Sequence, residues 1–115
     1  MTMMEYEVEE RSNTLIIRLT GDIDLQTSPN VRQGLMGSID KGRPIIVDLS
    51  GVDYIDSSGV ASLVESLQTM RKKGKQFILV SVSEKAMRVF QLARLDKVFT
   101  ICSDLDEGLK IVKGE

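Results

Sequence analysis

The hydrophobic period changes between residues 45 and 70, and this change restricts the chain to a small set of folds. The run Ile45-Ile46-Val47, followed by Leu49, is continuously apolar, which is typical of a strand buried on both faces of a parallel sheet. From Ser57 onward, apolar residues recur every three or four positions, which is the pattern of an amphipathic helix. A buried strand followed by an amphipathic helix is the repeating unit of α/β domains.

The N-terminal third begins with two strands of alternating character. Apolar side chains at residues 4, 6 and 8 alternate with glutamates, and residues 14–19 alternate again after a polar turn at 11–13. These segments predict a hairpin whose second strand ends at Gly21. Ser28-Pro29 then predicts a helix with Ser28 as its N-cap, which continues to about Ile39.

The C-terminal part predicts two more strands and two more helices. The strands are 77–80 and 98–102, and the helices start at Ser83 and Ser103. The predicted order is therefore β-β-α-β-α-β-α-β-α in a single domain over residues 1–115, with a mixed sheet. Ligands of such sheets collect at the carboxyl ends of the strands. Two polar loops, 21–24 and 53–59, are expected there.

Several residue types are absent or rare, and this excludes whole classes of site. The chain has no His and one Cys, so His-based triads, His-ligated metals, Cys-rich metal sites and internal disulfides are excluded. Fifteen basic against seventeen acidic residues give a net charge of -2, which argues against direct nucleic-acid binding. There is no apolar run of membrane length, no secretory signal pattern and no glycine-rich phosphate loop. We therefore predict a cytoplasmic protein with no metal, cofactor or membrane insertion.

The segment Asp56-Ser57-Ser58-Gly59 supports two interpretations. In the first it is only a helix start, because Asp and Ser are good N-caps and Gly permits a tight turn. In the second, Ser57 as the N-cap exposes a hydroxyl beside the positive end of the helix dipole, where a phosphoryl group could be held. A catalytic Ser57 is disfavoured because no His is available as a base. A phospho-acceptor aspartate of the response-regulator receiver type is disfavoured by the N-terminal hairpin.

Residues 47–59, Val-Asp-Leu-Ser-Gly-Val-Asp-Tyr-Ile-Asp-Ser-Ser-Gly, closely resemble the motif of the anti-sigma factor antagonists, which are stand-alone STAS domains. The segment 19–24 with Thr27 resembles a second conserved stretch of that family, and 89–92 and 95–99 resemble its third helix and the strand after it. The resemblance covers about Met4 to Val112.

The resemblance implies a switch between binding partners. Such proteins, when unphosphorylated, bind an anti-sigma factor that is also a serine kinase, and so release the sigma factor for transcription. The kinase phosphorylates the first serine of the motif, here Ser57, and a serine phosphatase reverses the reaction. Asp24 matches an acidic position beside the phosphorylation site. The other residues expected around Ser57 are Asp22, Thr27, Asp56, Ser58 and Gly59.

Two positions depart from the family pattern. Val60-Ala61 stand where Leu-Gly is frequent, and Arg94 stands where Gly often ends the third helix. A non-glycine residue in a left-handed cap is unfavourable, so we expect this helix to end differently.

The function predicted from the sequence is a phosphorylation-controlled anti-sigma factor antagonist that is not an enzyme. Two alternatives from other classes stay open. One is a STAS accessory subunit of a membrane transport complex, which acts by docking alone. The other is a small enzyme or nucleotide-binding domain, which the missing phosphate loop disfavours.

Overall fold

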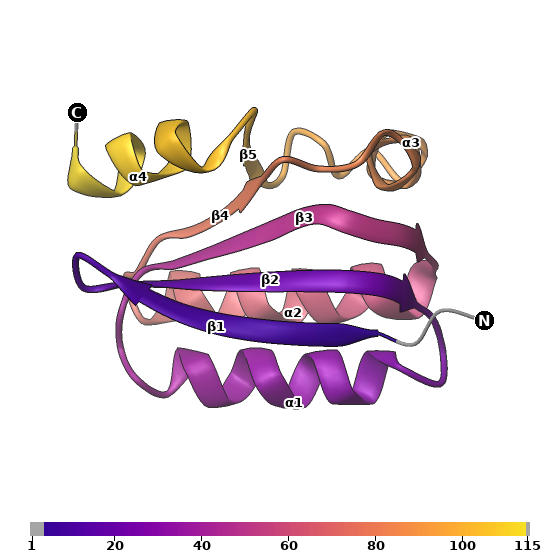
Figure 1. The fold of residues 1–115 in the computed structure, drawn as a ribbon, viewed down its shortest axis with the longest axis horizontal. Helices are drawn as coiled ribbons and strands as arrows, with labels where there is room; N and C mark the ends of the chain where they lie inside the picture. The colour runs from indigo at the N-terminus through magenta and orange to yellow at the C-terminus, as the bar shows by residue number, and fades with distance from the viewer. Residues whose placement is uncertain (1–3, 115) are drawn as a thin grey trace.

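The five strands lie in the sheet in the order in which they occur in the chain. The computed structural model describes residues 4–114 (Figure 1). Its strands are β1 (Glu5–Arg11), β2 (Thr14–Ile23), β3 (Ile45–Ile55), β4 (Phe77–Val80) and β5 (Thr100–Cys102). β1 is antiparallel to β2, and every later pair is parallel, which confirms the predicted mixed sheet.

Four helices alternate with the strands after the hairpin, in the predicted order. They are α1 (Ser28–Ile39), α2 (Ser57–Lys72), α3 (Glu84–Leu92) and α4 (Leu105–Lys113). α1 and α2 run side by side along one face of the sheet, and α4 lies on the other (Figure 1). Among the helices of residues 4–114, none combines the length and the hydrophobicity that a bilayer crossing needs.

The hairpin turn consists of two residues in the left-handed region. Ser12 has φ 51° and Asn13 has φ 66°, and the flanking residues Arg11 and Thr14 are paired. Two successive left-handed residues are the requirement of a type I′ turn, whose twist matches that of the strands. The polar turn predicted at residues 11–13 is therefore confirmed.

β2 and β3 are longer than predicted, and both pass through the segments that were expected to be loops. Gly21 pairs with Val52, and Ile23 pairs with Ile55. The register shifts twice along this stretch, between Arg18 and Thr20 and again between Gly21 and Asp22. Such irregularities insert residues on one strand and disturb the alternation of side chains. For that reason the hydrophobic period did not reveal that the strands continue.

Four predicted element starts were wrong by one or two residues. α4 begins at Leu105 with Asp104 as its N-cap, and not at Ser103. α1 begins at Ser28 with Thr27 as its N-cap, and the Thr27 side chain makes no capping bond because it is engaged in the preceding loop. α2 begins at Ser57, so Asp56 rather than Ser57 is the N-cap. β5 begins at Thr100, because the chain turns at Val98, whose N–H donates to the Leu95 carbonyl.

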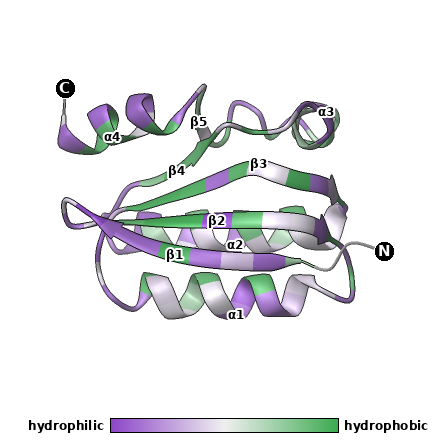
Figure 2. Cartoon of the chain, in the orientation of Figure 1, coloured by the Kyte–Doolittle hydropathy of each residue, from purple (hydrophilic) through white to green (hydrophobic). Residues whose placement is uncertain are grey.

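The core has two parts, one on each face of the sheet. The larger part holds the apolar residues of α1, α2 and α3 against β2, β3 and β4, and it includes the edge-to-face pair Phe90 and Phe99 at 5.5 Å. The smaller part holds Leu109 of α4 against Ile46, Val80 and Cys102. Figure 2 shows the contrast between the hydrophobic stretches of β2 to β4 and the mostly hydrophilic β1. The sheet is therefore anchored mainly by the helices on one face.

α3 ends in the left-handed conformation that glycine usually supplies, although Arg94 stands at that position. Arg94 has φ 59°, its N–H donates to the Gln91 carbonyl, and the Leu95 N–H donates to the Phe90 carbonyl at 2.8 Å. This bond pattern is a Schellman motif. The expectation that Arg94 would change the helix end is wrong, because burial of Phe90 beneath this turn holds the geometry.

Candidate functional site

The candidate site lies where β2 and β3 end side by side. Ile23 and Ile55 are paired there, and the Asp56 N–H donates to the Ile23 carbonyl at 3.1 Å. The loop from Asp24 to Thr27 and the start of α2 therefore leave the sheet at the same place, which confirms that the two polar segments meet at the carboxyl ends of adjacent strands.

The first turn of α2 is capped by Asp56. Its Oδ1 accepts the N–H groups of Ser58 at 2.9 Å and Gly59 at 3.3 Å. The same oxygen accepts the Ser58 hydroxyl at 2.5 Å. Because a carboxylate satisfies donors that a helix start leaves free, this arrangement stabilises α2 at the point where the site is built.

The Asp56 carboxyl has a lowered pKa despite its partial burial. Burial alone would raise the pKa, but hydrogen bonds from the Ser58 hydroxyl and from the N–H groups of Gly59, Ser58 and Leu25 outweigh it. Each of these donors favours the charged form. Asp56 is therefore a fixed negative charge immediately before Ser57 at neutral pH.

Ser57 and Ser58 differ in what their hydroxyl groups do. Ser58 is half-buried and donates to Asp56, so its hydroxyl is held within the cap. Ser57 is the exposed first residue of α2, and its hydroxyl makes no hydrogen bond to any residue between 4 and 114. Of the two serines in the motif, Ser57 alone presents a free oxygen to solvent.

Asp24 forms a compact loop with Thr27 and the end of β2. Its Oδ1 accepts the N–H groups of Gln26 at 2.9 Å and Thr27 at 3.0 Å. The Thr27 hydroxyl lies 2.8 Å from the carbonyl oxygen of Asp22 and 2.9 Å from the Asp24 nitrogen. These bonds give Asp24 a structural task in its own loop. A role of its charge toward a phosphoserine or a partner stays a prediction.

Gly59 lets the helix start rest directly on β2 and β3. A Cβ atom at this position would lie 2.5 Å from Cγ2 of Ile23 and 2.8 Å from Cγ1 of Ile55. The φ angle of Gly59 is not in the left-handed region, so close packing rather than backbone freedom requires the glycine. Gly59 therefore sets the distance between Ser57 and the sheet.

An apolar groove begins at Ser57 and runs between α2 and the α3 end. It has a volume of 450 Å³, and on α2 it is lined by Val60, Ala61, Val64, Glu65 and Gln68. On the other side it is lined by Val89, Ala93 and Leu95. This groove was not predicted, because the same three- and four-residue spacing that predicts α2 assigns its apolar residues to the core.

Two large apolar side chains on the segments that lead to the site are exposed, and neither was predicted to be. Leu25 is 76% exposed in the loop after β2, and Tyr54 is 53% exposed near the end of β3. An apolar residue inside the polar stretch 22–28 was the available clue for Leu25. Leu25 lies beside the start of α2, because its N–H donates to the Asp56 carboxyl.

The acidic and Cys side chains of the described residues do not form a metal site. Among the described residues, no three acidic or Cys side chains come together in a way that could hold a metal ion. Cys102 is buried at the end of β5, and burial together with nearby Glu107 and Asp104 raises the pKa of its thiol. Asp48 of β3 accepts the Ser50 N–H and lies 3.8 Å from the Arg18 guanidinium.

The model of the STAS domain family matches residues 5–108 of the chain. The chain belongs to the STAS domain family. This membership agrees with the fold, in which the hairpin, the parallel strands and the helix that starts at Ser57 follow the predicted order. The resemblance seen in the motif around Ser57 is thereby confirmed for nearly the whole STAS domain.

Two relatives of this STAS domain are named anti-sigma-B factor antagonists. The chain is 25% identical over 104 residues to the anti-sigma-B factor antagonist of Bacillus subtilis, and the match covers 90% of this chain and 95% of the relative. It is 29% identical over 97 residues to the anti-sigma-B factor antagonist of Listeria monocytogenes, covering 83% and 85%. The similarity to this chain covers most of the length of both relatives.

Solved structures show the same fold. An anti-sigma factor antagonist from Mycobacterium paratuberculosis has a TM-score of 0.88 and 26% identity, covering 96% of this chain and 94% of that one. The unphosphorylated form of the anti-sigma factor antagonist SpoIIAA has a TM-score of 0.81 and 23% identity, covering 96% and 98%. The second similarity, at this identity, concerns the fold alone.

Proposed function

We propose that this STAS domain is an anti-sigma factor antagonist whose binding is controlled by phosphorylation of Ser57. In the unphosphorylated form it binds an anti-sigma factor with serine kinase activity in the cytoplasm. Phosphorylation of Ser57 by that kinase releases the partner, and a serine phosphatase restores the binding form. In this proposal the chain is a regulatory binding protein and not an enzyme.

The observation that carries the proposal is the difference between the two serines of the motif. Ser57 is exposed and unbonded within the described part of the chain, whereas Ser58 is bonded to Asp56. A kinase must reach and deprotonate the hydroxyl that it modifies, so Ser57 is the suitable acceptor. The names of the relatives in Bacillus subtilis and Listeria monocytogenes support the class of partner.

The surface around Ser57 is suited to hold a protein partner. Leu25 and Tyr54 lie on elements that meet at the Ser57 end of the sheet, and the apolar groove begins at Ser57 itself. Apolar anchors surrounded by charged residues are the usual composition of a regulated interface. A modification of Ser57 would therefore fall within the contact surface.

The added phosphate has little to neutralise it on this protein. The N–H groups of Ser58 and Gly59, which would otherwise attract an anion to the helix start, are already bonded to Asp56. Phosphorylation adds about -1.5 to -2 charges at pH 7. Asp56, with its lowered pKa, is charged beside it. We therefore expect the phosphate to point outward and to leave the fold intact.

Charge repulsion of ordinary size is sufficient for release. With an effective dielectric near 20, one additional unit charge about 6 Å from a like charge costs roughly 2–3 kcal/mol. This energy corresponds to a roughly 30- to 150-fold loss of affinity. Exclusion of the partner at a rigid surface, without unfolding, therefore explains a switch of useful size.

The test uses an anti-sigma factor captured from the native cells with the chain as bait and then purified. We expect Ser57→Ala to bind it as tightly as the wild type and to resist release by the kinase reaction. Ser57→Asp should weaken binding at least about tenfold in calorimetry. Ser57→Asn is the matched control, because it has the same size as Ser57→Asp without the charge.

Two results would contradict the proposal. One is equal affinity of the wild type, the phosphorylated protein and Ser57→Asp for the same partner. The other is capture of a membrane transport protein with no anti-sigma factor, which would favour the accessory-subunit alternative.

A further inference from the structure

The outer edge of β1 has no neighbouring strand in the described part of the sheet. β1 is the first strand of the sheet order and pairs with β2 alone. Alternate N–H and C=O groups along an edge strand point outward and can pair with another chain. The seven residues of β1 are mostly exposed, and they include the apolar Tyr6 and Val8.

The N-terminal half of this edge carries more negative charge than the C-terminal half. Glu9 accepts hydrogen bonds from Arg11 at 2.6 Å and from Arg18 at 2.8 Å, and Glu10 forms an ion pair with Arg43. Glu5 and Glu7 form no ion pair with a residue between 4 and 114, although Glu7 stands opposite Arg18 in the β1–β2 pair, where Arg18 is bonded to Glu9. The N-terminal half of β1 is therefore acidic, while its C-terminal half is neutralised.

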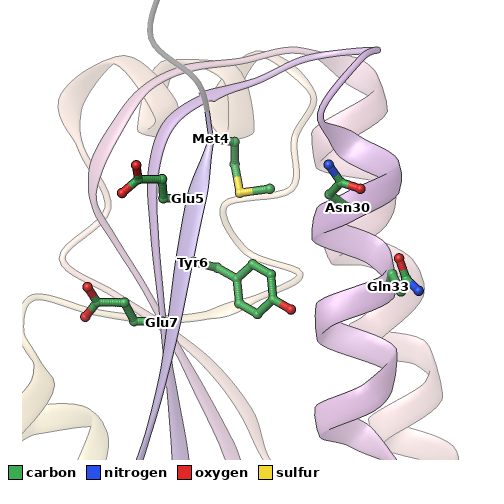
Figure 3. Close-up of a pocket in the computed structure, with 6 residues that line it drawn as sticks. All are labelled: Met4, Glu5, Tyr6, Glu7, Asn30 and Gln33. Atoms are coloured by element: carbon green, nitrogen blue, oxygen red, sulfur yellow. The ribbon is translucent and has the colours of Figure 1, made fainter.

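A groove of 530 Å³ accompanies the same half of β1, on the side that faces α1. Figure 3 shows Met4 and Tyr6 pointing toward α1, and Glu5 and Glu7 pointing away from it. The α1 side of the groove is formed by Asn30 and Gln33.

The Tyr6 ring packs against Gly34 of α1, where an added Cβ would be 2.9 Å from Tyr6 Cζ. β1 and α1 are therefore in contact at the groove. The edge strand, the groove and the unpaired glutamates thus coincide at one place.

We infer that this edge is a second docking surface, which takes an extended segment of another protein with alternating basic residues as a sixth strand. Successive side chains of a strand point to opposite faces. Basic residues at alternate positions would face Glu5 and Glu7, and the residues between them would face the groove at Tyr6, Asn30 and Gln33. The backbone of the segment would pair with β1, as in other cases of strand addition.

A second copy of this chain does not suit the surface. Pairing β1 with β1 would add the glutamates at positions 5 and 7 of a second copy to an edge that is already acidic, and like charges across strands are destabilising. The acidic edge therefore disfavours self-association and favours a cationic partner. This inference is independent of phosphorylation at Ser57, so the two proposals can fail separately.

The test uses a capped peptide, Lys-Thr-Lys-Leu-Lys-Thr-Lys, with the whole protein labelled for NMR. We expect chemical shift changes at the amides of β1 and slower hydrogen exchange at alternate β1 amides, with a Kd no weaker than about 1 mM. A second peptide with proline in place of both threonines keeps the charge but lacks two backbone donors. It should bind about fivefold more weakly or worse.

Two double variants distinguish a specific effect of Glu5 and Glu7 on peptide binding from an effect of the net charge of the protein. The double variant Glu5→Gln and Glu7→Gln should lower the affinity for the peptide by roughly threefold to tenfold. The matched control, Asp40→Asn with Asp106→Asn, removes the same charge from exposed positions elsewhere and should change nothing. Melting temperatures check that all variants are folded.

Three results would overturn the inference: no shift at β1 with about 1 mM peptide, shifts centred on another surface, or equal binding of the proline peptide. The last result would mean that charge attraction alone holds the peptide. An equal loss of affinity in the double variant and in its control would have the same meaning.

Discussion

Gly59 of α2 and Ile23 of β2 are in contact with no space between them, since a Cβ on Gly59 would lie 2.5 Å from Ile23 Cγ2. Ile23 immediately precedes Asp24, and Gly59 follows Ser57 by two positions. This one contact therefore connects the two loops of the candidate site. A change in its size would move Ser57 relative to the end of β2.

We expect Gly59→Ala to destabilise the protein by about 1–3 kcal/mol, the usual range for overpacking, because the neighbouring atoms belong to buried core residues. Gly37→Ala is the matched control in α1, where an added Cβ meets nothing within 4 Å. It should stabilise the protein by about 0.8–1.0 kcal/mol through helix propensity. Urea unfolding of both variants gives the comparison, and a stabilised Gly59→Ala would contradict the contact.

Asp56→Ala should cost about 1 kcal/mol at pH 7, because it removes the cap of α2. The pKa of Asp56 is lowered in the folded protein, so its charge stabilises the fold above the unfolded value near 4. That contribution is lost as the pH falls through the lower folded pKa. The difference between wild type and Asp56→Ala should therefore narrow below about pH 4. Urea unfolding of the wild type and of Asp56→Ala at several pH values measures this difference, and a difference that does not change with pH would contradict the role of the charge.

The kinase reaction should modify Ser57 and not Ser58, because only the Ser57 hydroxyl is free and exposed. Fragment mass spectrometry of the phosphorylated protein locates the group. Ser58→Ala should still be phosphorylated, and Ser57→Ala should not. Phosphate found mainly on Ser58 of the wild type would contradict the assignment.

Asp24→Asn isolates the charge of Asp24 from its role in the loop. The Asn Oδ1 can still accept the N–H groups of Gln26 and Thr27, so we expect an unchanged melting temperature. We expect weaker kinase binding or slower phosphorylation, because the negative charge beside the site is lost. Unchanged rates in a stable variant would mean that Asp24 serves only its own loop.

Arg94→Gly should stabilise the protein by about 1 kcal/mol, because a non-glycine residue in the left-handed region is unfavourable by roughly that amount. Arg94→Ala keeps the unfavourable backbone and removes the charge, so it should not stabilise. Thermal unfolding separates the two. Equal stability of both variants would show that the change in the free energy of unfolding comes from loss of the Arg94 side chain and not from the left-handed backbone.

The order and type of every element followed from hydrophobic periods and turn residues, because each helix has a buried stripe, β1 and β2 were recognised by alternation, and β3 and β4 contain a continuous apolar run. The ends of β2 and β3 did not follow. The register shifts near Gly21 break the alternation, and pairing of Ile23 with Ile55 is a long-range interaction that no local pattern contains. The left-handed Arg94 was missed for the same reason, since tertiary packing outweighs its local preference.

The candidate site was predictable as a set of residues but not as a set of contacts. The motif indicated Asp56, Ser57, Ser58 and Gly59, yet the choice between Asp56 and Ser57 as N-cap depends on one backbone conformation. The groove between α2 and α3 requires the distance between two helices. The exposure of Leu25 was not predicted for a simpler reason. A single apolar residue in a loop forms no repeating hydrophobic pattern from which its exposure could be inferred.

The agreement between strand order and chain order has a consequence for how the protein is made. Each new strand joins the edge left by the strand before it, so no strand must be inserted between two that are already paired. The sheet can therefore grow from β1 toward β5 while the chain leaves the ribosome. In that sequence the larger core forms under α1 and α2 first, and α4 covers the second face last. The Ser57 surface is complete only when α3 has been synthesised, because the groove needs Val89 and Leu95.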